Sequence, residues 1–76
     1  MHDFDMENDG YRGFAYIGDA PNWSSSVRIV RAGDADMAAG GGFRKSVPGP
    51  FHNRDAAVVA CRDVFVASVK TGSTGL

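Results

Sequence analysis

The clearest hydrophobic pattern in the chain lies between residues 54 and 70, where apolar residues recur every three or four positions. This spacing places them on one side of a helix, with Arg62 and Asp63 on the other side. The apolar side is made of Ala57, Cys61, Val64, Phe65, Ser68 and Val69. Asn53 is a good N-cap residue, and Gly72 can adopt the left-handed conformation that ends helices. The pattern predicts a helix over residues 54–70.

Three earlier segments have the composition of β-strands. Residues 11–17 are rich in aromatic residues, residues 27–31 are β-branched and partly alternating, and residues 43–47 alternate until Pro48 ends them. A short link between the first two favours a hairpin, and residues 32–42 are expected to form a flexible loop. These elements predict an α+β fold: a three-stranded antiparallel sheet with one C-terminal helix packed on one face, in the order β-β-β-α.

The alternation leaves open which side of the first strand is buried. Arg12, Phe14 and Tyr16 share one side of an extended residue 11–17 segment, while Tyr11, Ala15 and Ile17 share the other. Val27 and Ile29 are expected to share a face, as are Phe43 and Val47. With one helix available, the second face of the sheet is expected to meet water or a partner.

Charge and composition complete the domain prediction. The chain has 76 residues and a net charge of −1, but residues 1–10 carry four acidic side chains and residues 11–76 carry a net +3. We expect a disordered acidic leader over residues 1–10, closing on the turn signal Asn8-Asp9-Gly10, a single domain over 11–72 and a disordered tail over 73–76. The N-terminus does not resemble a secretory signal and the chain has one cysteine, so a cytoplasmic location is expected, without a membrane span.

The most suggestive binding candidates combine aromatic and basic residues. They are Arg12, Phe14, Tyr16 and Arg28 on the strands, with Arg44 and Lys45 beside the glycine-rich segment. On an open sheet face such residues stack on nucleotide bases and contact phosphates. The simpler interpretation places Phe14 and Tyr16 in the core, with the arginines reaching solvent at its edge. A pI near 6.0 also argues against nucleic acid.

Catalytic and metal motifs are weak. Cys61 is expected to be a buried, unactivated thiol and His52 to pack or cap near the helix start. Residues 5–10 begin like a calcium loop, but its twelfth position is Tyr16 instead of glutamate. Two histidines and one cysteine are too few for a structural zinc site, and residues 40–46 do not match a phosphate loop. We predict no catalytic residue, no metal site and no cofactor.

The segment Tyr11-Arg12-Gly13-Phe14, the strand from Trp23 to Ile29 and the alanine-rich final helix resemble small uncharacterised proteobacterial proteins of β-β-β-α type. The resemblance covers roughly residues 11–70 and implies the architecture alone, since such families have no agreed activity.

The sequence therefore favours a small non-enzymatic protein-interaction module that acts through its open sheet face or an edge strand. Its partner is expected to be another protein or a second copy of the chain in a homodimer. The alternative is a weak nucleic-acid-binding domain that uses the aromatic and basic residues. A third possibility, a small hydrolase or thiol enzyme, depends on Cys61 and His52.

Overall fold

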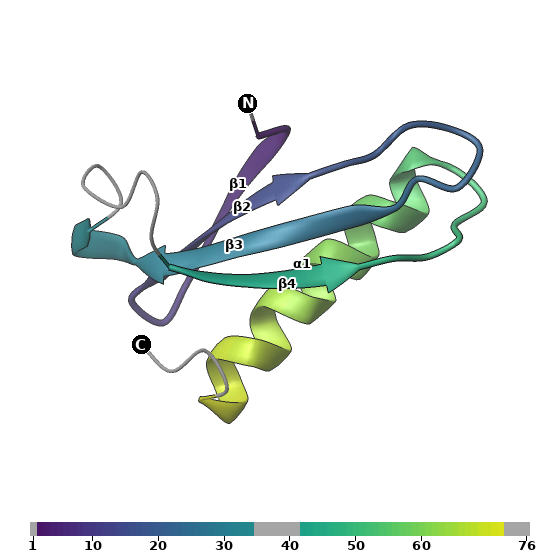
Figure 1. Cartoon of the computed structure of the whole chain (residues 1–76). Coiled ribbons are helices and arrows are strands. Elements are labelled where there is room, and N and C mark those ends of the chain that lie inside the picture. The colour runs from purple at the N-terminus through teal and green to yellow at the C-terminus, as the bar shows by residue number, and fades with distance from the viewer. Residues whose placement is uncertain (1, 35–41, 73–76) are drawn as a thin grey trace.

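The protein is a four-stranded antiparallel sheet with one helix on one of its faces (Figure 1). The computed structural model describes residues 2–34 and 42–72. The strands are β1 (Phe4–Asn8), β2 (Tyr11–Tyr16), β3 (Ser25–Arg31) and β4 (Phe43–Val47), and they lie side by side in chain order. A short 3₁₀ turn, η1 (Ala32–Asp34), follows β3, and the helix α1 spans Arg54–Thr71. The predicted α+β class, antiparallel sheet and C-terminal helix are confirmed, but the prediction of three strands is wrong because β1 adds a fourth.

Strand β1 forms inside the segment that the charge distribution predicted to be a disordered leader. Its register pairs Phe4 with Ala15 and Asn8 with Tyr11, on either side of the turn at Asp9 and Gly10. Both turn residues have positive φ, 52° and 82°, which is the conformation of a type I′ hairpin turn and fits the right-handed twist of the strands. The acidic residues of this segment alternate with apolar ones, so one side can be buried while the charges stay in water.

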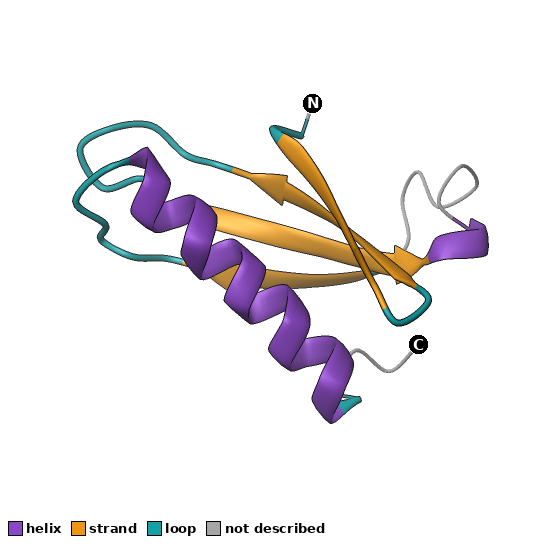
Figure 2. Cartoon of the chain, turned by 180° about the vertical axis from the view of Figure 1, so that it is seen from behind, coloured by secondary structure: helices purple, strands orange, loops and turns teal. Residues whose placement is uncertain are grey.

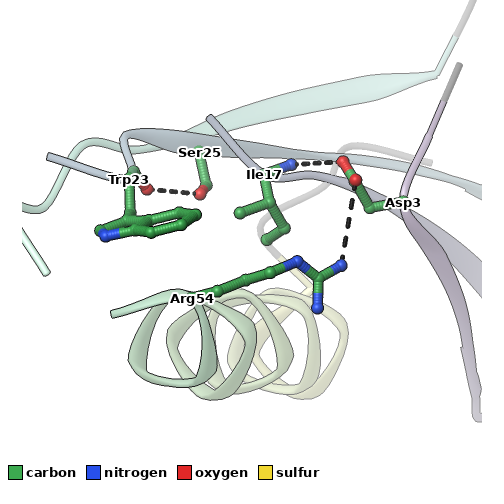
Figure 3. Close-up of polar contacts among 5 residues, drawn as sticks. All are labelled: Asp3, Ile17, Trp23, Ser25 and Arg54. Carbon is green, nitrogen blue, oxygen red and sulfur yellow. Dashed lines mark hydrogen bonds and ion pairs between the residues drawn. The ribbon is translucent and has the colours of Figure 1, made fainter. Parts of the chain in front are cut away.

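The start of β1 is attached to the rest of the fold through Asp3 (Figure 3). Its carboxylate Oδ2 accepts a hydrogen bond from the Ile17 N–H at 2.7 Å, and its own N–H donates to the Ala15 carbonyl at 2.7 Å. Its Oδ1 also lies 3.9 Å from Arg54 Nη2, in the first turn of α1. One aspartate thereby joins β1, the end of β2 and the start of the helix.

Helix α1 has the caps and the buried side that the sequence predicted. The Asn53 side chain accepts a hydrogen bond from the Ala56 N–H at 2.9 Å, and Gly72 is left-handed with φ of 70°. The buried residues of α1 are Ala57, Cys61, Phe65, Ser68 and Val69, while Arg62 and Asp63 are exposed. The β-branched residues of the helix lower its intrinsic propensity, so packing of this apolar side on the sheet stabilises it.

Two small residues on β2 make room for the largest buried side chain of the helix. Phe65 is 1% exposed, and its ring packs directly over Gly13. A Cβ atom placed on Gly13 would lie 2.7 Å from Phe65 Cδ1, far inside van der Waals contact. Next to it, Ala15 is completely buried. The helix therefore supplies the aromatic volume of the core, and the central strand supplies the space for it.

The register decides which side of β2 faces the helix. Ala15 pairs with Phe4 on one side and Val27 on the other, and all three belong to the layer beneath α1. Alternation then places Phe14 and Tyr16 on the opposite face. The interpretation of these two rings as core residues is wrong, because Phe65 already occupies the space over β2.

Figures 1 and 2 show the same arrangement from opposite sides: the helix lies behind the sheet in Figure 1 and in front of it in Figure 2. The predictions that Val27 and Ile29 share one face of the sheet, and that Phe43 and Val47 share a face, are confirmed. Most of the loop predicted over residues 32–42 and the tail predicted over 73–76 fall outside the described residues.

Candidate binding surfaces

The face of the sheet turned away from α1 brings together residues from all four strands, and we call it the open face. One cross-strand row consists of Asp5, Phe14, Arg28 and Arg44, taken from β1 to β4. The flanking rows are Glu7, Arg12 and Val30 on one side, and Tyr16, Ser26 and Ser46 on the other. Five of the six binding candidates thus share this face: Arg12, Phe14, Tyr16, Arg28 and Arg44. Lys45, the sixth, is exposed on the helix side of β4 and does not join them.

The two rings of the open face lie against guanidinium groups from neighbouring strands. The Arg28 Cζ atom is 5.8 Å from the centroid of Phe14, and the Arg44 Cζ atom is 5.6 Å from the centroid of Tyr16. Both distances are within the range of cation–π attraction. Arg28 is only 8% exposed and its guanidinium Nη2 atom is buried, whereas Arg44 is exposed. The inner arginine orients the ring, and the outer one presents its charge to solvent.

His2 is also part of the open face, although it is not among the six binding candidates predicted from the sequence. Its ring packs edge-on against Phe14 at 4.9 Å between centroids and against Tyr16 at 6.4 Å, and its Nε2 contacts the Asp5 carboxylate. No pattern in the sequence points to this contact, since it exists only because β1 pairs with β2. The open face is therefore bordered by a histidine and two acids at β1.

Charge is divided across the open face. The acidic side chains Asp5 and Glu7 lie on β1, and the three arginines lie on β2, β3 and β4. Within residues 2–34 and 42–72, neither Arg12 nor Arg44 is ion-paired with a carboxylate. The β2–β4 side therefore offers positive charge to an anionic partner.

A second surface lies at the outer edge of β1, where the strand runs beside α1. In a two-residue hairpin the residues flanking the turn form a hydrogen-bonded pair, so Asn8 and Met6 direct their peptide groups towards β2. The peptide groups of Asp5 and Glu7 consequently point outward, and within the described residues no strand pairs with them.

Beside this edge is a groove of about 600 Å³, which we call the β1–α1 groove. It is lined from β1 by Asp5, Met6, Glu7 and Asn8, and from α1 by Arg62, Asp63, Phe65, Val66, Ala67 and Lys70. Val66 in this lining is 45% exposed and presents apolar surface beside the unpaired strand. The helix thus places an apolar surface where the alternate side chains of an added strand would lie.

The residues that a thiol enzyme would need do not form an accessible site. Cys61 is completely buried beneath the sheet, and His52 is exposed in the loop before α1. Desolvation raises the pKa of the Cys61 thiol; the hydrogen bond with Ser25 opposes this rise and the charge of Asp3 adds to it. Ser25 itself donates through Oγ to the Trp23 carbonyl at 2.7 Å (Figure 3). The thiol is held in its neutral form, which is a poor nucleophile.

Comparison of the chain with family models, with curated proteins and with solved structures gave no match. The resemblance to proteobacterial β-β-β-α proteins accordingly stays a prediction. Across the part of the chain that the structure describes, no helix has the length and apolar character that crossing a membrane requires.

Proposed function

We propose that this protein is a non-enzymatic protein-interaction module that binds an extended segment of a partner as an added strand along β1. The observation that carries the proposal is the outward-facing peptide groups of Asp5 and Glu7 beside the β1–α1 groove. An unpaired strand edge offers backbone hydrogen bonds to any extended chain, and an adjacent groove adds selectivity through side chains.

The surroundings of β1 define the partner's side-chain pattern. Successive residues of an added strand alternate between the two faces of the sheet. On one face they meet the carboxylates of Asp5 and Glu7, which favour lysine or arginine. On the other face they lie over the groove, where Met6 and Val66 favour apolar side chains. The expected ligand is a segment that alternates basic and apolar residues over about five positions.

The same geometry argues against a homodimer formed by two β1 edges. Within β1 the outward peptide groups are those of Asp5 and Glu7, so an antiparallel β1–β1 pair places an acid opposite an acid in each hydrogen-bonded register. Like charges directly opposite each other destabilise a strand pair. A second copy would have to present its β4 edge, where Arg44 and Ser46 alternate.

The test uses a synthetic eight-residue peptide that alternates valine and lysine, added to the ¹⁵N-labelled full chain. We expect amide resonances of Asp5 and Glu7 to shift and their hydrogen exchange to slow, because their N–H groups become hydrogen-bonded. Two control peptides carry N-methyl groups on alternate backbone positions, either on the lysines or on the valines. Only one of the two sets places methyl groups on the edge that pairs with β1, so one control should lose binding and the other should keep it.

A charge reversal tests the selectivity. Glu7→Lys is expected to weaken binding of the lysine peptide and to favour a peptide that alternates valine and glutamate. Asp19→Lys makes the same change of charge in the exposed β2–β3 connection and should leave the preference unaltered. The proposal is wrong if the lysine peptide causes no change at β1, or if both N-methylated controls bind equally well. Sedimentation of the protein without peptide distinguishes peptide binding from self-association, because the self-associated fraction would increase with protein concentration.

A further inference from the structure

We infer that the open face is a second, separate binding site, and that its ligand is single-stranded nucleic acid. This inference does not depend on the proposed strand addition at β1, since it concerns the residues of β2, β3 and β4. The observations behind it are two aromatic rings and three arginine side chains that share the face of the sheet turned away from α1.

The rings are spaced for stacking on successive bases. Phe14 and Tyr16 are two residues apart on the same strand, which separates their side chains by about 7 Å along the sheet. Both rings are half-buried, so part of each remains accessible to solvent. Each ring already lies against a guanidinium, and that of the exposed Arg44 offers a further flat surface on which a base can stack. Rings and cations are thus already side by side on this face, which we call the platform.

The cations lie where a backbone crossing this platform would pass. Arg12, Arg28 and Arg44 belong to three adjacent strands, and neighbouring strands are about 4.8 Å apart. Arg44 is exposed, and like Arg12 it has no carboxylate partner within residues 2–34 and 42–72. Phosphate contacts of these two side chains would therefore break no ion pair among residues 2–34 and 42–72.

The acidic side chains on β1 determine which part of the open face a nucleic-acid backbone can cross. Asp5 and Glu7 repel phosphates, so the nucleic-acid backbone is expected to cross the β2–β4 side and to avoid β1. His2 packs edge-on against Phe14 and limits access to that ring, which leaves Tyr16 as the more accessible stacking surface. A single strand fits this arrangement better than a duplex, because a duplex keeps its bases stacked on one another and out of reach of the rings.

The experiment measures fluorescence anisotropy of labelled single-stranded RNA and DNA of ~12 nucleotides, and of a duplex of the same length, with the full chain at low salt. We expect the single strands to bind and the duplex to bind more weakly. Tyr16→Ala should weaken binding by about tenfold or more, while Tyr16→Trp, which keeps a stacking surface, should restore it. Circular dichroism of each variant verifies that it is folded.

A matched pair of arginine variants separates this site from general electrostatic attraction. Arg44→Gln removes a charge from the open face, and Arg31→Gln removes the same charge from an exposed position on the opposite side of the sheet, where Arg31 pairs with Tyr11. We expect Arg44→Gln to lower both the affinity and the slope of log affinity against log salt, by about 0.7 if one phosphate contact is lost. Arg31→Gln should change neither quantity.

Three results would overturn the inference: no binding of either single strand at low salt, equal losses for the two glutamine variants, or tighter binding of the duplex. A poly-glutamate chain serves as the probe for an acidic protein partner. If it binds as tightly as the oligonucleotides and Tyr16→Ala has no effect on it, the open face recognises acidic polypeptide and the inference is wrong. The alternating valine–lysine peptide should not compete with the oligonucleotide, so failure at one surface leaves the other testable.

Discussion

Replacement of Gly13 by alanine tests the central packing contact of the fold. The added Cβ atom would lie 2.7 Å from Phe65 Cδ1 and 3.0 Å from Cε1, whereas carbon atoms in van der Waals contact are about 3.5–4.0 Å apart. The ring of Phe65 must therefore move by roughly 1 Å. It is 1% exposed and surrounded by the buried core, so this movement disturbs packing throughout the layer.

The expected cost follows from two opposing effects. Overpacking of a well-filled core costs about 1–3 kcal/mol. The φ of Gly13 is not in the left-handed region, so alanine also restricts the unfolded chain and returns about 0.4–1 kcal/mol. The net decrease in the free energy of unfolding is about 1–2 kcal/mol, which is a large fraction of the roughly 3–5 kcal/mol that a domain of this size has. The unfolding temperature should fall by about 5–15 °C.

Urea unfolding, followed by Trp23 fluorescence and by far-UV circular dichroism, measures this change. Gly33→Ala is the matched control: among the described residues no heavy atom lies within 4 Å of its added Cβ, and its stability should stay within about 0.5 kcal/mol of the wild type. Phe65→Leu removes the ring that meets the new Cβ, so Gly13→Ala should cost about 1 kcal/mol less in that background. Equal stability of the two alanine variants, or strict additivity in the double variant, would refute the reasoning.

Three further predictions concern the helix, the start of β1 and the buried thiol. Asn53→Ala should lower the free energy of unfolding by about 1 kcal/mol through loss of the N-cap, and Asn53→Asp should recover most of it; equal losses would contradict the capping role. Asp3→Ala should lower the free energy of unfolding by about 1 kcal/mol, because the Ile17 N–H loses its acceptor. Arg54→Ala should lower it by less than half as much, since its ion pair with Asp3 is exposed. Chemical denaturation of both variants compares the two losses. Burial raises the pKa of the Cys61 thiol, so the thiol of the unfolded chain ionises first and lowers the free energy of unfolding as the pH rises above about 9, the ordinary value. Urea unfolding over this pH range should therefore show a smaller decrease for Cys61→Ala than for the wild type, and equal decreases would contradict the effect.

The secondary-structure elements that depend on local sequence pattern can be predicted from the sequence alone. Helix α1 was predicted within one residue of its C-terminal end, together with Asn53, Gly72 and the buried side that includes Phe65. The strands β2, β3 and β4 were also located, because β-branched and aromatic runs between glycine and proline are local signals. These features follow from periodicity and backbone preference, which a single segment carries within itself.

Strand β1, which the sequence did not predict, also has a local alternating pattern, but its acidic residues favoured the prediction of disorder. Phe4 and Met6 alternate with Asp5 and Glu7, and the hairpin turn after them is a common type, but the acidic run favoured disorder. Strand β2 and helix α1 make this segment a strand: once they have folded, Phe4 and Met6 can bury apolar surface against them, which stabilises the extended conformation. A segment of this kind is a strand only in the presence of its neighbours.

The position of the aromatic residues of β2 could not be decided from alternation, which is satisfied equally by either face. Three-dimensional packing decided it. Phe65 enters the core from the helix, and only the side of β2 with Gly13 and Ala15 is small enough to receive it. Phe14 and Tyr16 are placed on the open face as a consequence, and the arginines and His2 gather around them. Local sequence preferences specified the elements, whereas the finite volume between sheet and helix determined which side chains remain available for binding.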